Sequence, residues 1–160
     1  MNLLLICIME IQVDIKEKLL TTAKSFLKEQ ISNLEKELKE LQQSAEADEK
    51  SSAGDKYETH QEMLNQSRTI LEKRLSSSKT MINQLNAVPV KETKTVEDGS
   101  LLKLPMGNIW VSVPFGKLDF EGTAYQLVSP DSPLIQAIWG QKEGSIATFR
   151  DKSFEIEKLV

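Results

Sequence analysis

Residues 44–55 have the sequence SAEADEKSSAGD, and this polar stretch divides an otherwise helical first half of the chain. Before it, apolar positions recur in steps of four and three, at Leu27, Ile31, Leu34, Leu38, Leu41 and Ala45. After it, the same steps continue through Leu64, Arg68, Leu71, Leu75, Ser78, Ile82 and Leu85. This is the heptad period of packed helices. Because Gly54 breaks the pattern, the sequence predicts an antiparallel helical hairpin over residues 10–86, with its tip near residues 46–55.

The limits of the two helices follow from local signals. No proline or glycine occurs between residues 10 and 53, so we expect a first helix from about Val13 to Ala45. The second helix is expected to begin near Asp55 and to stop at Val88, because the residue before Pro89 is disfavoured in a helix. The two heptad stripes, which are the rows of positions spaced by four and three residues, leave a second interpretation open. In it, two copies of the chain form a homodimeric coiled coil.

The first nine residues form an apolar run, MNLLLICIM. A membrane-spanning helix needs roughly 20 such residues, and the basic start and small-residue cleavage site of a signal peptide are absent. We expect residues 1–9 to be an unstructured or irregular extension, with Met9 as the natural start. A short arm that packs elsewhere is the alternative. The expected location is the cytoplasm.

Composition excludes several classes of function. The 160 residues carry a formal charge of −4, which gives no support for tight binding to nucleic acid phosphates. The chain has one cysteine, Cys7, and one histidine, His60, so an internal disulfide framework is excluded and a Cys/His zinc site is not expected. We expect a monomer without a cofactor of its own that is not itself an enzyme.

The predicted tip is acidic. Between Ser44 and Glu58 there are five acids and two bases, a local charge of −3. Asp48, Glu49 and Asp55 are the candidate catalytic carboxylates, in an assisting role, because exposed carboxylates on a long arm can deliver oxygen ligands to a Mg²⁺ ion in a partner's active site. For Asp55 and Glu58, the capping-box spacing offers a purely structural alternative.

The second half of the chain has a different pattern. Residues 87–99 lack helical periodicity and are expected to be a linker, followed by a domain over residues 100–160. Short strands separated by turns are expected there at 100–104, 108–113, 117–120, 123–129, 146–150 and 153–158. One short helix interrupts them, with Ser132 as N-cap, Pro133 in the first turn and Gly140 as the stop. The fold class is therefore α+β, and most of the domain's seven aromatic residues are expected in its core rather than in a ligand pocket.

The stretch from Ser129 to Gly144, SPDSPLIQAIWGQKEG, resembles the hallmark segment of the bacterial Gre transcript cleavage factors. Ser129, Ser132, Pro133, Leu134, Ala137, Gly140 and Gly144 stand at matching places, whereas Gln141 and Ser145 replace the usual lysine and aspartate. The order of a helical hairpin before a small β-rich domain is also similar, so the resemblance covers nearly all of residues 10–160. It implies that the C-terminal domain is an FKBP-like antiparallel sheet with one short helix.

The resemblance implies a function as well. It implies an elongation regulator that docks on RNA polymerase through Ser129, Ser132, Pro133, Leu134 and Gly140. The hairpin would enter the secondary channel and share the polymerase's Mg²⁺ at the tip. The tip departs from the family, because the two acidic positions of its pattern fall on Lys50 and Ala53 when Tyr57 is matched to the family's tyrosine.

Because of that departure, stimulation of the polymerase's own RNA cleavage and blockage of the channel without cleavage both remain open. Two functions outside transcription stay as alternatives. One is a proline isomerase, which would need an open aromatic pocket in the FKBP-like domain. The other is a coiled-coil adaptor without any role at polymerase.

Overall fold

The computed structural model describes residues 3–50 and 55–160, and describes side chains for residues 12–50 and 56–160. The chain divides into two compact units. One is continuous, Ser25–Ile82, and the other combines Met1–Lys24 with Asn83–Val160. The beginning of the first helix therefore belongs to the same unit as the β-rich domain, a division that we did not expect from the helical pattern.

Two long helices make up the first half of the chain: α1 (Leu3–Glu49) and α2 (Asp55–Ala87). The α2 limits match the predicted start at Asp55 and the predicted stop before Pro89. The α1 helix is longer than the predicted Val13–Ala45. Residues 3–9, expected to be irregular, are helical, since they contain no glycine or proline and run without a break into a strong helical sequence. None of the described helices is long and apolar enough to cross a membrane.

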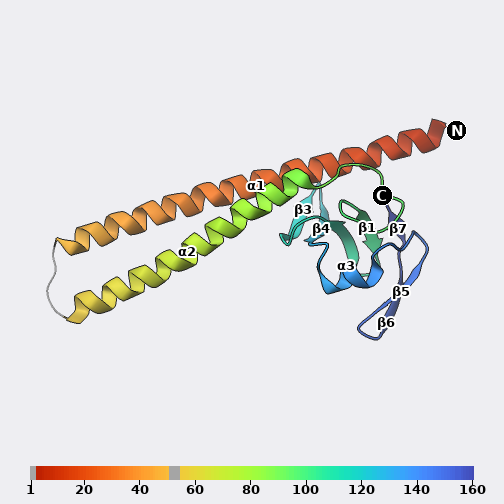
Figure 1. Cartoon of the computed structure of the whole chain (residues 1–160). Coiled ribbons are helices and arrows are strands. Elements are labelled where there is room, and N and C mark those ends of the chain that lie inside the picture. The colour runs from red at the N-terminus through yellow and green to blue at the C-terminus, as the bar shows by residue number, and fades with distance from the viewer. Residues whose placement is uncertain (1–2, 51–54) are drawn as a thin grey trace. The chain divides into compact units, whose positions relative to one another are not determined.

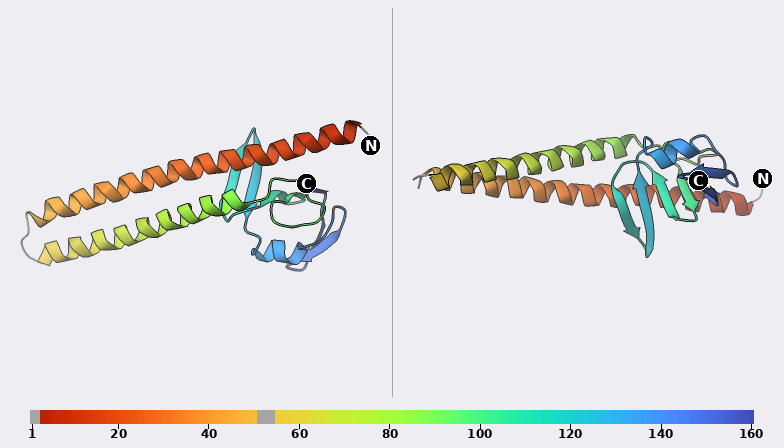
Figure 2. Two further views of the ribbon diagram at one scale, coloured as in Figure 1. Left: turned by 45° about the horizontal axis from the view of Figure 1, so that its top comes forward. Right: turned by 90° about the horizontal axis from the view of Figure 1, so that it is seen from below.

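Within the unit Ser25–Ile82, α1 and α2 form the predicted antiparallel hairpin, side by side in both views of Figure 2. Leu27 and Leu34 are buried in the seam between them. Two side-chain contacts join the helices: an ion pair from Lys79 Nζ to Glu35 Oε1 at 2.8 Å, and a contact of 2.6 Å between His60 Nε2 and Asp48 Oδ2. The cross-helix contacts within one chain confirm the hairpin, which buries Leu27 and Leu34 without a second copy.

The β-rich domain contains a five-stranded sheet with the order β3-β4-β2-β1-β7 and a separate ribbon of β5 and β6 (Figure 1). The bounds are β1 Leu101–Leu104, β2 Gly107–Val111, β3 Gly116–Phe120, β4 Thr123–Val128, β5 Ile146–Phe149, β6 Lys152–Glu155 and β7 Lys158–Leu159. The sheet is mixed rather than purely antiparallel as predicted, because β2 pairs in parallel with β4. The hairpin partner β3 lies outside β4, which places β4 directly beside β2.

Alternation along β2 separates the two faces of the sheet. Ile109 and Val111 belong to a core cluster on one face, together with Ile135 and Ile138 of α3 (Pro133–Ile138). The intervening Trp110 points to the other face and is fully buried there. The remaining members of the core cluster are Val96, Leu102, Leu104, Ala147, Phe154, Ile156 and Leu159.

The other face of the sheet is also covered. Leu118 and Leu127 share it with Trp110, and both are buried. In the same compact unit, the early part of α1 contributes the buried side chains of Leu19 and Ala23. The aromatic residues follow the core prediction only in part, because Trp139, directly after α3, is 45% exposed.

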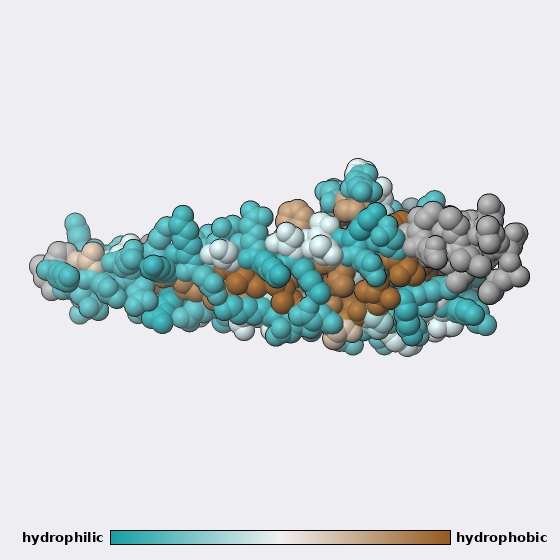
Figure 3. Space-filling model, turned by 90° about the horizontal axis from the view of Figure 1, so that it is seen from above, coloured by the Kyte–Doolittle hydropathy of each residue, from teal (hydrophilic) through white to brown (hydrophobic). Residues whose placement is uncertain are grey.

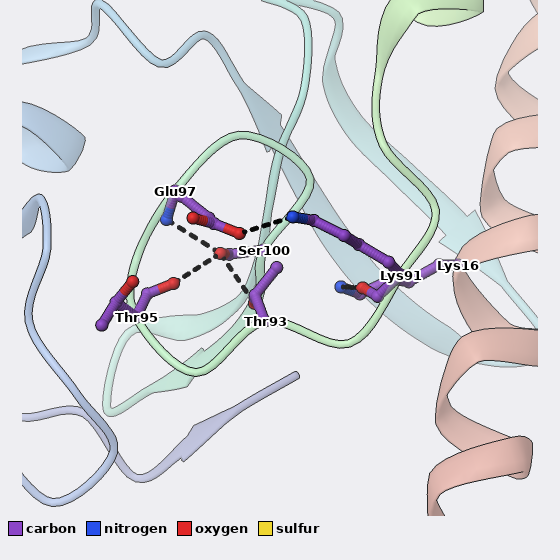
Figure 4. A network of polar contacts seen from close by, with 6 residues as sticks. All are labelled: Lys16, Lys91, Thr93, Thr95, Glu97 and Ser100. Atoms are coloured by element: carbon purple, nitrogen blue, oxygen red, sulfur yellow. Dashed lines mark hydrogen bonds and ion pairs between the residues drawn. The ribbon is translucent and has the colours of Figure 1, made fainter.

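Residues 88–100, which include most of the expected linker, form a packed loop (Figure 4). Val96 N donates to Gln141 O at 2.8 Å, and the buried Ser100 hydroxyl is hydrogen-bonded to Thr93 Oγ1 at 2.9 Å. The buried Lys16 of α1 donates from Nζ to the carbonyl oxygen of Lys91 at 2.7 Å. The loop therefore ties α1 to the sheet domain instead of spacing two independent domains.

Gly99 in this loop is held by a close backbone approach. Its φ is +85°, and a Cβ atom at this position would lie 2.3 Å from the carbonyl oxygen of Pro89. Its N–H donates to Val111 O at 2.9 Å. Only glycine fits this combination of dihedral angle and contact.

Candidate functional site

The acidic end of α1 is the first candidate site. Glu46, Asp48 and Glu49 lie in its last turns, where the helix dipole disfavours negative charge and the last turn contains no basic residue. Their accumulation is therefore not explained by helix stability. Asp55 is the first residue of α2, but its side chain, and with it the predicted capping box, lies outside the described residues.

Asp48 does not simply present its carboxylate to solvent. Its Oδ2 atom lies 2.6 Å from His60 Nε2 across the hairpin, and the two side chains are 37% and 49% exposed. Sequence reasoning missed His60 as a site residue. The antiparallel order of the stripes places the end of α1 opposite the beginning of α2, but the exact register that brings His60 to Asp48 is not encoded locally.

The structure does not bring Asp48 and Glu49 together as two ligands of one ion. Adjacent positions on a helix point in different directions. The nearby Glu46 carboxylate accepts a hydrogen bond from Gln42 Nε2 at 3.1 Å. Among the described residues, no group of three or more His, Cys, Asp or Glu side chains could hold a metal ion. Sharing of a partner's Mg²⁺ by Asp48, Glu49 and Asp55 thus stays a prediction.

The segment around α3 is the second candidate site. Ser132 has the extended backbone of an N-cap, and its Oγ accepts a hydrogen bond from Ile135 N at 3.4 Å. Pro133 follows at the start of the helix, where its missing N–H costs nothing. Ser129 Oγ accepts from Asp131 N at 3.2 Å, which shapes the turn before the helix. These residues build α3 as the sequence predicts.

The end of the segment is fixed just as firmly. Gly140 has φ +75° and terminates α3, and its N–H donates to Val96 O at 2.9 Å. Gly144 has φ +79° and donates to Ile156 O at 2.8 Å. Leu134 is half-buried against the core. Most of the predicted partner-binding residues therefore also have a local structural role.

The surface left for a partner lies beside these residues. Pro133, Gln136 and Trp139 are exposed. A shallow hollow of about 460 Å³ adjoins the segment and is lined by Pro114, Gly116, Gln126, Leu127, Val128, Ser129, Asp131 and Ser132. An exposed tryptophan is the kind of side chain that dominates binding at protein interfaces. The sequence predicted only that most of the seven aromatic residues lie in the core, and it did not single out Trp139, because its apolar character gives no indication of which way it points after the helix ends.

No protein-family model matches this chain, and no curated protein matches it. One similar solved structure is described as "Structure of the transcription factor Gfh1". It aligns with a TM-score of 0.38 and 15% sequence identity, over 86% of this chain and 93% of that chain.

Proposed function

We propose that this chain is a Gre-like transcription elongation regulator that binds RNA polymerase at its secondary channel. The observation that carries the proposal is the segment from Ser129 to Gly144. Its sequence resembles the Gre hallmark, and it forms a capped helix with exposed residues on a β-rich domain. The antiparallel hairpin with acids at its end is the second part of the expected layout.

The two structural parts suit two tasks. The surface around α3 offers Trp139 and Pro133 for docking. In the hairpin unit, residues 25–49 of α1 span roughly 37 Å at 1.5 Å per residue, long enough to enter a narrow channel. The surface around α3 would dock on the polymerase, and the hairpin would enter the channel. Binding would then depend on α3, and the regulatory effect would depend on the tip.

Channel blockage without cleavage is the second candidate effect. The observation in its favour is the His60 pair, which engages the Asp48 carboxylate within the chain. Cleavage stimulation would require Glu49, or Asp55, to supply ligands to the polymerase's Mg²⁺, or Asp48 to leave His60. Cleavage stimulation predicts release of RNA fragments from a backtracked polymerase complex, and channel blockage predicts none.

Binding is tested first, by pull-down of core RNA polymerase with the full chain. Trp139→Ala should reduce the amount of polymerase recovered. Met106→Ala is the matched control, since Met106 is 58% exposed on the β1–β2 turn, away from α3 in the sequence. Failure of the wild-type chain to retain polymerase would refute the proposal and favour an adaptor role.

The effect is tested with a backtracked elongation complex and Mg²⁺. Release of short 3′ RNA fragments would establish cleavage stimulation, and loss of release in Asp48→Ala, Glu49→Ala or Asp55→Ala would identify the carboxylates involved. Glu37→Ala removes an exposed acid that lies earlier in α1 than Asp48 and Glu49, and this variant should behave as wild type. Binding without fragment release, together with slowed nucleotide addition, would establish channel blockage instead.

A further inference from the structure

A groove lies between α1 and α2 in the distal half of the hairpin. Its volume is about 530 Å³. Apolar side chains of Leu38, Leu41, Ala45 and Leu64 contribute to its walls. The other lining residues are polar or charged: Glu35, Lys39, Gln42, Glu46, Glu49, Gln61, Asn65, Arg68 and Glu72.

The groove exists because the seam is not filled at this level. Arg68 occupies a seam position in the heptad pattern, but its Nε donates to Glu72 Oε1 at 2.8 Å and its side chain is 64% exposed. Ala45, on the other helix, is too short to fill the space. Leu38 and Leu64 therefore remain half-exposed, whereas Leu27, which lies farther from the tip, is fully buried. On the face drawn in Figure 3, hydrophobic side chains show as a band bordered by hydrophilic ones, and the hairpin toward its tip is mostly hydrophilic.

The charge of the groove limits what can occupy it. The lining contains four glutamates and two basic residues, but Glu35 is paired with Lys79 and Glu72 with Arg68, so the acidic excess of the groove is Glu46 and Glu49 at its tip end. Among the described residues, Glu49 makes no ion pair, and it stands at the tip end of the groove. An acidic rim repels nucleic acid phosphates and attracts basic side chains. An apolar floor between two helices suits the apolar face of a third helix.

A hydrogen-bond donor in the groove lacks an acceptor. Gln61 Nε2 is buried and has no partner among the described residues. A buried unsatisfied donor is costly, and an acceptor on an incoming segment would remove that cost. The groove is therefore incomplete in both its apolar and its polar contacts.

We propose that this groove binds a basic amphipathic helix of a partner protein, which lays its apolar face on Leu38, Leu41 and Leu64 while its lysines or arginines meet Glu46 and Glu49. This interaction goes beyond the proposed function, since it is a property of the hairpin that does not require α3 or the polymerase channel. A second copy of the chain is a poorer occupant, because residues 25–82 carry eleven acids and nine bases and so offer no basic excess to meet Glu46 and Glu49.

The test uses the full chain and a synthetic helical peptide of about 16 residues, long enough to cover the roughly 21 Å from residue 35 to residue 49. The peptide carries leucines at i, i+3, i+4 and i+7 and lysines beside them, and a twin carries glutamates in place of the lysines. Calorimetry is expected to detect binding of the basic peptide only. Equal binding of the twin, or no binding of the basic peptide up to about 1 mM, would overturn the proposal.

Matched variants locate the binding surface. Ala45→Leu fills the groove and should raise the Kd at least about tenfold, whereas Ala47→Leu, on an exposed part of the same helix turn, should stay within about twofold. Equal effects of the two variants would overturn the proposal. Both substitutions suit a helix, and circular dichroism checks that the hairpin is retained.

Two double variants that each remove two negative charges complete the test. The double variant Glu46→Gln/Glu49→Gln should weaken binding and its dependence on salt, and the equally charged control Glu37→Gln/Glu40→Gln should weaken it less. Sedimentation of the wild-type chain decides the remaining competitor. A dimer that Ala45→Leu dissociates would overturn the proposal in favour of self-association, and a monomer supports it.

Discussion

The buried ammonium group of Lys16 yields a quantitative prediction. Burial lowers its pKa from the ordinary 10.5 to about 8, against the opposing attraction of the Glu97 and Glu92 carboxylates. Because the folded-state pKa is the lower of the two, the unfolded chain binds more protons between these values. Stability from this group therefore increases as the pH rises from about 8 to about 10.5. Below about pH 8, the folded state holds a charge that burial disfavours.

The magnitude follows from the two pKa values. At 1.36 kcal/mol for each pKa unit, the full effect is about 3 kcal/mol, of which about 2 kcal/mol should appear between pH 7 and about pH 9.5. Lys16→Met removes the effect and also leaves the Lys91 carbonyl without its donor, at a cost of about 1–3 kcal/mol that does not depend on pH. The difference in free energy of unfolding between wild type and Lys16→Met, followed across pH, therefore isolates the titration of Lys16.

Urea unfolding of both proteins at several pH values measures this difference. Relative to Lys16→Met, the wild-type chain should gain about 2 kcal/mol in free energy of unfolding between pH 7 and about pH 9.5. Lys28→Met, at an exposed position of α1, should show a constant difference from wild type. Parallel curves for wild type and Lys16→Met would refute the assignment of a buried, titrating lysine.

Three further substitutions, two of them with a matched control, test the packing. Leu27→Ala should cost roughly 3 kcal/mol because Leu27 is fully buried, whereas Phe26→Ala, at a half-exposed position, should cost much less in the same urea titration. Gly99→Ala should destabilise by more than about 2 kcal/mol, since the new methyl group would meet the Pro89 carbonyl; a melting temperature equal to wild type would contradict the loop geometry. Ser132→Ala should cost about 1 kcal/mol through loss of the N-cap of α3, and Ser132→Asp should largely restore stability.

Features encoded by neighbouring residues could be predicted from the sequence. The heptad stripes, the break at Gly54, and the cap and stop of α3 depend on positions within a few residues of one another, and the hairpin and α3 formed as expected. The parallel pairing of β2 with β4 could not be predicted in this way. Strand partners depend on contacts distant in sequence, and alternation specifies which face a residue occupies but not which strand lies beside it.

The candidate site shows the same limit. The sequence identified Asp48 as an acid at the tip, but its partner His60 depends on the register of two helices. A signal for Lys16 was available, since it stands four residues before Leu20 and seven before Ala23, on the apolar side of the helix. Its acceptor, Lys91 O, is 75 residues away and could not be inferred. The outward direction of Trp139 depends on how α3 packs, which no local pattern encodes.

The division of the chain has a consequence for its synthesis. The unit Ser25–Ile82 is continuous, so it can form from local contacts as soon as it leaves the ribosome. The other unit joins the first 24 residues to the last 78, and its strand β1 pairs with β7 at the very end of the chain. At ordinary elongation rates, the early turns of α1 wait on the order of 10 s for their partners. During that interval Leu19 and Ala23 lack the residues that bury them in the folded unit, so they are open to chaperones and to aggregation.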